Sequence, residues 1–336
     1  MKILCCFFLL AIFHPTILKL SAEPIPIIFD TDMGSDCDDV GALALLHHYV
    51  KNGKAEILGC IYSSGTVPYG AAVIQAINTY YERGEIPIGA NHDPEVGDPV
   101  DKMQAEKLAK DQIAFGHTFV HSNEVEDQTL LNRKLLSKSE DNSVIYLTVG
   151  HTKGLYDLLK SEADTISPLS GMQLVRQKVK AWVALGALGA YNKEKHFVKD
   201  WNFYFNNTAP FTAYVVEHIP TDAYFVDAGT QVMTGKSLLP TPPGNIVRTA
   251  YRDWLWNVEK KTLQDQRPSW DLAAVFFAVE GLGDFLEFGP DGHLEFKEEV
   301  GSRWNTEIPQ SNHFYVKQKE NTNRPFADYL NKRIVK

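Results

Sequence analysis

Cysteine is scarce in this sequence, with only four among 336 residues. Cys5 and Cys6 lie near the N-terminus, which leaves Cys37 and Cys60 for the rest of the chain. Two cysteines cannot build the disulfide framework of a small, loop-rich domain. Whether these two pair with each other stays open, because the apolar stretch around Cys60 suits a buried thiol equally well.

Long basic runs, internal repeats and low-complexity segments are also absent from the sequence. The formal charge is −9, so a basic groove for nucleic acid is not expected, although an acidic protein can still bind a neutral small molecule. Hydrophobic residues make up 44% and charged residues 22%, which is typical of a folded chain. The length allows one large α/β domain or two smaller ones.

Hydrophobic runs are short. The most apolar one, residues 3–13, follows Lys2 and is shorter than the ~20 residues that a membrane-spanning helix needs. Small residues at Ser21-Ala22 then suit cleavage. We therefore predict a secretory signal peptide over residues 1–22, with an uncleaved membrane anchor as the alternative. Residues 23–336 would then be a secreted domain without membrane contact.

Negative charge is concentrated between an apolar run, residues 27–29, and a second apolar stretch, residues 40–46. The first predicts a buried strand and the second a packed helix. Five acids lie between them: Asp30, Asp32, Asp36, Asp38 and Asp39. Burying one unpaired carboxylate costs several kcal/mol, so a buried junction of this kind needs a cation. Oxygen ligands favour Ca²⁺ or Mg²⁺. The alternative is a solvated loop that caps the helix.

Strand-like and helix-like segments alternate along much of the chain. Together they predict a mostly parallel, Rossmann-like sheet flanked by helices in a single large domain. The expected strands are 55–62, 86–89, 144–149, 179–186 and 223–227, and the expected helices include 69–81 and one that starts near Ser269 as its cap. A hairpin is expected over 286–296 around Asp291-Gly292, and a last helix over 327–334.

The segment Asp30-Thr31-Asp32-Met33-Gly34, followed by Asp38-Asp39-Val40-Gly41-Ala42-Leu43, resembles the N-terminal signature of the inosine-uridine-preferring nucleoside hydrolases. The segments 186–205 and 267–275 resemble later motifs of that family. The resemblance covers roughly residues 25–280. It implies the nucleoside hydrolase fold and a calcium-dependent N-ribohydrolase that splits ribonucleosides into ribose and free base. A role in purine salvage and assembly as a homodimer or homotetramer are also implied.

Matching these motifs position by position gives the site that the resemblance implies. Calcium would be held by Asp32, Asp39, Asp271 and the backbone carbonyl of Val149. The ribose would be held by Asp38, Asn192, Asp200 and Asn202. Asp32 or a neighbouring carboxylate such as Asp38 would take the proton of the water that attacks C1′.

Some residues depart from the family pattern. Trp270 stands where the family commonly has a histidine, and we expect it to stack on a purine and so favour purine nucleosides. The acidic loop is two residues longer than the commonest form, so Asp36 and Asp38 could exchange roles. Thr66 stands where the family has an asparagine that helps to hold the ribose, and Asp200 where it usually has a glutamate.

Two other functions remain open from the sequence. One is a nucleoside- or ribose-binding protein of the same fold that has lost turnover with the histidine. The other is a phosphatase of the haloacid-dehalogenase type, in which Asp30 is phosphorylated, Asp32 is the general acid and Mg²⁺ is bound. The pair His117 and His121 could line a substrate site, and Asn206 begins a glycosylation sequon.

Overall fold

The computed structural model describes residues 23–34, 36–98, 105–308 and 311–336. The predicted signal peptide, residues 1–22, lies outside the described residues and stays a prediction. Within the described ranges, no helix combines the length and apolar character needed to cross a bilayer.

Short β-branched and apolar runs form the strands, in nearly the places that the sequence predicts. The strands are β1 (Ile25–Thr31), β2 (Ala55–Tyr62), β3 (Ile88–Ala90), β4 (Glu126–Asp127), β5 (Val144–Thr148), β6 (Val179–Leu185), β7 (Asp222–Asp227), β8 (Met233–Thr234), β9 (Arg267–Pro268), β10 (Leu286–Phe288), β11 (His293–Lys297), β12 (Gly301–Asn305) and β13 (His313–Gln318).

The helices fill the connections between them. They are α1 (Asp38–Lys51), α2 (Gly70–Tyr80), α3 (Ala105–Lys110), α4 (Gln112–Phe115), α5 (Gln128–Lys138), α6 (Lys153–Lys160), α7 (Gly171–Lys178), α8 (Ala209–His218), α9 (Ile246–Trp254), α10 (Trp270–Glu280) and α11 (Asn323–Asn331), with short helical turns η1 (Ser122–Glu124), η2 (Lys236–Leu238) and η3 (Leu255–Glu259).

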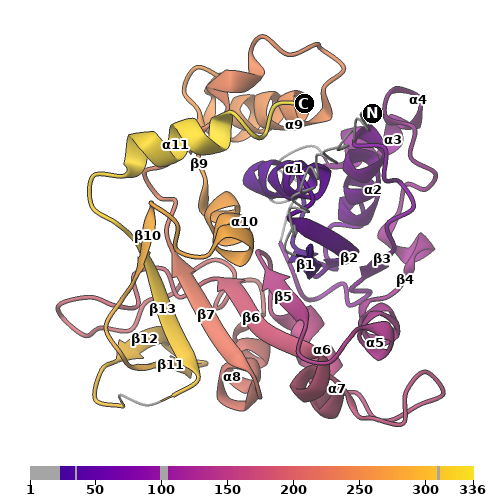
Figure 1. Ribbon diagram of the computed structural model, residues 1–336. Helices are drawn as coiled ribbons and strands as arrows, with labels where there is room; N and C mark the ends of the chain where they lie inside the picture. The colour runs from indigo at the N-terminus through magenta and orange to yellow at the C-terminus, as the bar shows by residue number, and fades with distance from the viewer. Residues whose placement is uncertain (1–22, 35, 99–104, 309–310) are drawn as a thin grey trace, which may run out of the picture.

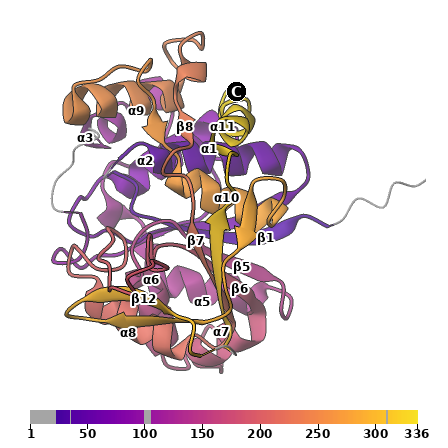
Figure 2. The ribbon, with the colours of Figure 1, turned by 90° about the vertical axis from the view of Figure 1, so that its left-hand side faces the viewer.

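One nine-stranded sheet organises the chain, in the order β10-β13-β7-β6-β5-β1-β2-β3-β4. All neighbouring strands are parallel except β10 and β13. Helices α5 to α8 lie on one face, and α1, α2 and α10 on the other with α9 and α11 outside them (Figures 1 and 2). The predicted mostly parallel α/β fold is confirmed.

The two faces of the sheet bury two separate cores because successive strand residues point to opposite sides. In β1, Ile27 and Phe29 join the core under α1 and α10, whereas Ile28 joins the core under α5 to α8. Trp182 of β6 lies in that second core and is fully buried. Strands that are buried on both faces have nearly continuous apolar sequences, and the central strands of this sheet follow that pattern.

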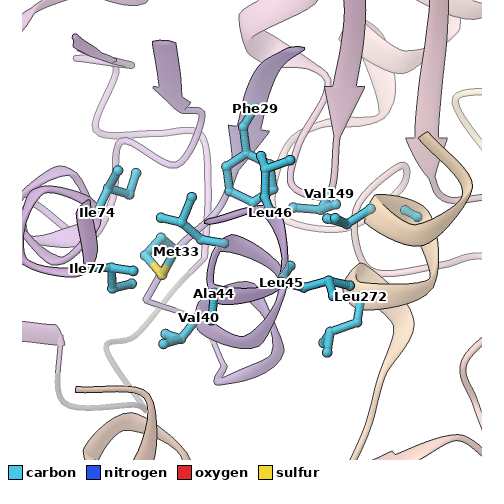
Figure 3. Close-up of a cluster of buried hydrophobic side chains, with 14 of the residues drawn as sticks. Phe29, Met33, Val40, Ala44, Leu45, Leu46, Ile74, Ile77, Val149 and Leu272 are labelled. Atoms are coloured by element: carbon cyan, nitrogen blue, oxygen red, sulfur yellow. The ribbon is translucent and has the colours of Figure 1, made fainter. Parts of the chain in front are cut away.

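Helix α1 is buried on almost every side, between α2 and α10 (Figure 3). Ile74 and Ile77 lie on its α2 side and Leu272 on its α10 side. A Cβ at Gly41 would come 2.2 Å from the hydroxyl oxygen of Tyr251, so only glycine allows α9 to pack this close. The acidic first turn of α1 is therefore held in place by the core.

The chain leaves β1 toward β2, β3 and β4 on one side and returns to β5 on the other. Helix α1 after β1 and helix α6 after β5 therefore lie on opposite faces of the sheet, and a crevice opens beyond the carboxyl ends of these strands. Ligands of open α/β sheets bind at such a switch point. The acidic loop that follows β1 lies at this place (Figure 1).

The predicted hairpin over 286–296 is wrong. β10 pairs with β13 at the edge of the main sheet, whereas β11 pairs with β12 in a separate two-stranded ribbon. Pro290 separates the two strands and has no N–H to continue a ladder, and its carbonyl accepts from Trp304 Nε1 instead.

Cys37 and Cys60 are both buried and unpaired, so Cys60 is a buried thiol of the core.

His313 couples the stability of this fold to pH. Its ring stacks on His293 at 4.1 Å and its Nδ1 accepts from the Leu294 N–H at 3.2 Å. Burial, assisted by the charge of His293, lowers the pKa of His313 to about 3. The unfolded chain takes up this proton near pH 6.5. Stability is therefore complete above about pH 6.5 and falls below it, by up to about 1.4 kcal/mol per pH unit.

We expect His313→Asn, which keeps an acceptor near Nδ1, to lose less stability than the wild type between about pH 6.5 and pH 4. Thermal unfolding midpoints across this range measure the difference. His218→Asn, on an exposed face, is the control and should leave the slope unchanged. Parallel pH profiles for wild type and His313→Asn would contradict this account of the buried imidazole.

Candidate active site

A cavity of about 330 Å³ opens at the carboxyl ends of β1, β5 and β6. Its lining is strongly acidic and aromatic. The residues that matter below are Asp32, Asp36, Asp38, Asp39, Asp200 and Asp271, with Arg267, Val149, Asn202, Trp201, Trp254 and Trp270. Six carboxylates and one guanidinium thus share this lining within the described part of the chain.

The turn after β1 brings its carboxylates together. The hydroxyl of Thr31 accepts from the Met33 N–H at 3.1 Å and donates to Asp39 Oδ1. Gly34 adopts a φ of 126°, which side chains other than glycine rarely allow. The loop therefore folds back, so that Asp32 at the strand end and Asp39 at the start of α1 line the same cavity.

The turn after β5 lies directly against the end of β1. A Cβ at Gly150 would come 2.2 Å from the Asp32 amide nitrogen, so glycine permits this approach. The side chain of Val149 is buried in the hydrophobic core (Figure 3), and Val149 is among the residues that line the cavity. The Val149 carbonyl accepts from Asn202 Nδ2 at 2.6 Å.

Arg267 is the cation of the site, and the sequence motif gave no role to it. Its Nη2 lies 2.6 Å from Asp36 Oδ2 and its Nε 3.1 Å from Asp38 Oδ1. The guanidinium is stacked between Trp254 at 4.1 Å and Trp270 at 4.8 Å. Asp36 and Asp38, whose roles the sequence left interchangeable, thus share a single arginine.

The carboxylates are packed too closely for all of them to ionise at their ordinary pH. Burial favours the neutral form of Asp36, but the charge of Arg267 and hydrogen bonds with Asp38 and Arg267 together outweigh it and lower the pKa of that carboxyl. Burial raises the pKa of Asp38, Asp39 and Asp271 well above the ordinary value, and the charges of neighbouring aspartates add to this. One guanidinium is not enough to neutralise the group.

Two further side chains lie beside Asp32 that the sequence did not single out. His151 Nε2 lies 3.5 Å from Asp32 Oδ2 and 3.5 Å from Asp98 Oδ2. Burial disfavours the imidazolium, but the charges of Asp98 and Asp30 oppose it and raise the pKa of His151. His151 directly follows Gly150 in the turn after β5, so a position at the strand ends could have been predicted from the sequence. Nothing in the sequence near Asp98 indicated a site.

Asp200 and Asn202 reach the cavity as predicted. Asp200 accepts from the Ala187 N–H at 3.0 Å and the Phe203 N–H at 2.9 Å, which fixes the glycine-rich turn after β6. Burial raises the pKa of Asp200 to about 6 despite these bonds. Asn202 joins this turn to the end of β5 through the Val149 carbonyl.

The structure does not bring Asn192 to the cavity. Its side chain donates to the Gly189 and His196 carbonyls and accepts from the His196 N–H, so it closes its own turn. Residues 193–196 after it are exposed. The predicted ribose contact from Asn192 is therefore corrected to a turn-forming role, because the loop carries the side chain away from the strand ends.

Trp270 lines the cavity at the start of α10, next to Asp271. Its Nε1 donates to Thr230 Oγ1 at 3.0 Å, and Arg267 stacks on its ring. Ser269 is at the N-cap position of this helix as expected, but its side chain makes no capping hydrogen bond and its hydroxyl bonds Thr234 Oγ1 at 2.8 Å. The ring is thus fixed in orientation at the rim of the acidic group.

Other candidates from the sequence lie elsewhere. His117 is buried with Nε2 2.6 Å from the Ala109 carbonyl, and His121 packs on Tyr69, so neither lines the cavity. Thr66 donates to the Asp98 carbonyl. Asp30 is fully buried and accepts from the Tyr146 hydroxyl at 3.1 Å, outside the cavity lining. A phosphoryl group could not reach it, which disfavours the phosphatase alternative.

The donor set fits a hard divalent cation. The predicted ligands Asp32, Asp39, Asp271 and Val149 all line the cavity, and Asp32 Oδ2 is buried with no hydrogen-bond partner among the described residues. The tightest groups differ from that set, however. Ligand atoms of Asp36, Asp38 and Asp271 lie within 4.8 Å of one another, as do those of Asp32, Asp98 and His151. Arg267 forms ion pairs with Asp36 and Asp38 in the first of these groups.

Solved structures share this fold. The plant nucleoside hydrolase PpNRh1 aligns at 14% identity with a TM-score of 0.62, over 93% of this chain and 99% of that one. A purine-preferring ribonucleoside hydrolase from Gardnerella vaginalis gives 15% identity and a TM-score of 0.63, over 92% and 98%. The type III effector protein XopQ, complexed with adenosine diphosphate ribose, gives 12% identity and 0.62, over 94% and 96%.

No family model matches the chain, and no curated protein sequence does. The structural matches extend over nearly the whole of both partners. The chain therefore has the nucleoside hydrolase fold, which confirms the fold that the N-terminal motif implied.

Replacing Arg267 tests the electrostatic account of the site. Arg267→Met leaves Asp36 and Asp38 without their cation in a buried setting, so we expect a loss of about 3–5 kcal/mol in unfolding free energy. Urea denaturation at pH 7 in metal-free buffer measures it. Arg303→Met is the matched control, because its partner Glu295 is half-exposed and such pairs contribute about 1 kcal/mol or less. Equal losses in both variants would refute the account.

Proposed function

We propose that the protein is a metal-dependent hydrolase that cleaves the N-glycosidic bond of ribonucleosides, releasing ribose and free base, with a preference for purines. The observation that carries this proposal is the convergence of Asp32, Asp39, Asp271 and Asn202 in one cavity of a nucleoside hydrolase fold. A cavity of about 330 Å³ is within the range of small-ligand sites, which starts near 300 Å³.

The sugar end of the substrate belongs at the acidic floor of the cavity. Carboxylates and amides bind the hydroxyls of a diol at fixed geometry. Asp38, Asp200 and Asn202 supply such groups there, in place of the larger set that included Asn192. Arg267 holds Asp38 in orientation and limits its freedom to rotate toward other partners.

Asp32, Asp39, Asp271 and the Val149 carbonyl are the residues that would hold Ca²⁺ in this proposal. When bound, such an ion would orient a water molecule and lower its pKa. The chain itself must then accept a proton. Asp32 is placed for this task, because it directly follows β1 and lines the cavity.

The base end belongs against the aromatic rim. Trp201, Trp254 and Trp270 line the cavity, and Trp201 is 45% exposed. Ring stacking stabilises a flat base without requiring one base identity, and the larger purine gains more. None of the three can donate a proton to the departing base as a histidine could. In this proposal, solvent protonates the base while the tryptophan rings stack on it.

A binding protein without turnover is the second candidate. It is favoured by one specific observation, the Arg267 guanidinium that already pairs with Asp36 and Asp38 in the acidic group. The cavity would then bind a nucleoside or ribose but hold the catalytic metal ion more weakly. The sequence-based proposals of secretion and of a homodimer or homotetramer apply to both candidates.

Ribose release decides between them. The purified residues 23–336 are incubated with inosine, adenosine, guanosine and uridine, and reducing sugar is measured with EDTA and after Ca²⁺ is restored. We expect release that EDTA abolishes and Ca²⁺ restores. Asp271→Asn should lower kcat/KM by more than about 100-fold, because loss of even an outer partner of a metal ligand costs about 10–100-fold. Calcium-dependent nucleoside binding without release would establish the binding protein instead.

Trp270 is expected to set the purine preference. Base stacking on an aromatic side chain contributes about 1–3 kcal/mol, which is about 5–150-fold. Trp270→Leu should lower kcat/KM for inosine by this factor and for uridine by less. Trp256→Leu is the control, since Trp256 is 61% exposed and lies outside the cavity lining. Equal losses on inosine and uridine would contradict the stacking role.

A further inference from the structure

A second group of metal-type ligands shares Asp32 with the set that the family resemblance implies and adds Asp98 and His151, which are not among the residues that line the cavity. One ligand atom of each of these three residues lies within 4.8 Å of the other two. His151 Nε2 faces the Oδ2 atoms of Asp32 and Asp98. Asp32 is 3% exposed, Asp98 1% and His151 0%. Each of these three atoms is buried without a hydrogen-bond partner among the described residues. Buried polar atoms are rarely left in this state, so three that converge need an explanation.

The distances among them point to a bound ion. His151 Nε2 lies 3.5 Å from each of the two carboxylate oxygens, which is longer than the ~2.9 Å usual for an N–H···O bond. Zinc bonds to nitrogen and oxygen are about 2.0–2.2 Å. Two ligands at the corners of a tetrahedron of this size lie roughly 3.4 Å apart. The two measured separations match that spacing.

The outer partners of these ligands are also those of a metal site. His151 Nδ1 lies 3.4 Å from the Asn202 carbonyl, which can only accept, so Nδ1 carries a hydrogen and Nε2 is the nitrogen left to bind an ion. Asp98 Oδ1 accepts from Trp201 Nε1 at 2.7 Å and from Asn206 Nδ2 at 3.2 Å. Such contacts fix the orientation of metal ligands and leave the other atom of each side chain free.

We propose that Asp32, Asp98 and His151 form a separate site for a transition-metal dication, of which Zn²⁺ is the representative. Two carboxylates cancel the charge of the ion, and the imidazole selects it over Ca²⁺, which prefers oxygen ligands. Three protein ligands leave a fourth position for water, the arrangement of zinc sites in hydrolytic enzymes. Asp32 also belongs to the proposed calcium set, so the two proposed sites share this side chain.

The proposal does not rest on the proposed nucleosidase activity, because its test measures bound metal. The chain is stripped with chelator, titrated with Zn²⁺ or Co²⁺ in the presence of excess Ca²⁺, and analysed for metal content after desalting. We expect one tightly held equivalent, and a visible Co²⁺ absorption typical of four-coordinate nitrogen and oxygen ligands. Thermal unfolding should shift upward with added Zn²⁺.

Three variants locate the ion. Asp98→Asn and His151→Gln should each weaken Zn²⁺ binding by more than about 100-fold, and Trp201→Phe, at a half-exposed side chain, by about 10–100-fold. Trp201→Phe keeps the test informative if a buried replacement fails to fold. His121→Gln is the control for loss of a histidine elsewhere, and should retain both the bound equivalent and its Co²⁺ spectrum.

Either of two results would overturn the proposal. One is wild-type protein that retains no Zn²⁺ or Co²⁺ under excess Ca²⁺, which would leave His151 as a protonated counter-charge between two carboxylates. The other is binding whose affinity and spectrum are unchanged in Asp98→Asn and Trp201→Phe. A failed ribose assay bears on the nucleosidase proposal and not on this measurement.

Discussion

Repulsion among buried carboxylates is the constraint on which the site depends. Six line one cavity, and Asp38 and Asp39 sit in the first turn of a helix that is buried on almost every side. The helix N-terminus is favourable for negative charge, but by less than about 2 kcal/mol, which cannot offset several buried charges. The protein meets this cost in two ways. Arg267 pairs with Asp36 and Asp38 and lowers the pKa of Asp36, and the buried carboxyls of Asp38, Asp39 and Asp271 have raised pKa values, which favours their neutral form.

The parallel sheet makes such a concentration of charge sustainable. Its strands are buried on both faces by apolar residues, so the fold does not depend on the polar groups at the strand ends. The switch between β1 and β5 opens a crevice there, and Gly150 lets the two loops come within contact of each other. The two hydrophobic cores stabilise the fold, and the acidic residues are confined to the carboxyl ends of the strands. Their unpaired charges can be tolerated there because the cores offset the cost.

The residues that depart from the motif that the sequence resembles are connected in space. Trp270, at the position where that motif commonly has a histidine, is one of two rings that lie against Arg267, and Arg267 in turn pairs with Asp36 and Asp38 of the acidic loop. The aromatic rim of the cavity is thus in contact with its acidic floor. His151 and Asp98 add a third element, in which a nitrogen ligand enters an otherwise oxygen-rich site.

The sequence by itself determined the sheet and the acidic loop. Short apolar, β-rich runs such as Val144–Thr148 favour buried strands, and five acids between a strand and a helix indicate a site at their junction. The sequence could not determine whether Asn192 closes a turn or binds a ligand, because its short side chain suits both roles. It also could not determine which strands residues 286–296 pair with, because strand pairing depends on contacts between residues far apart in sequence. Only the tertiary structure placed Arg267 against Asp36 and His151 against Asp98, since contacts between residues far apart in sequence depend on how the elements pack and not on local pattern.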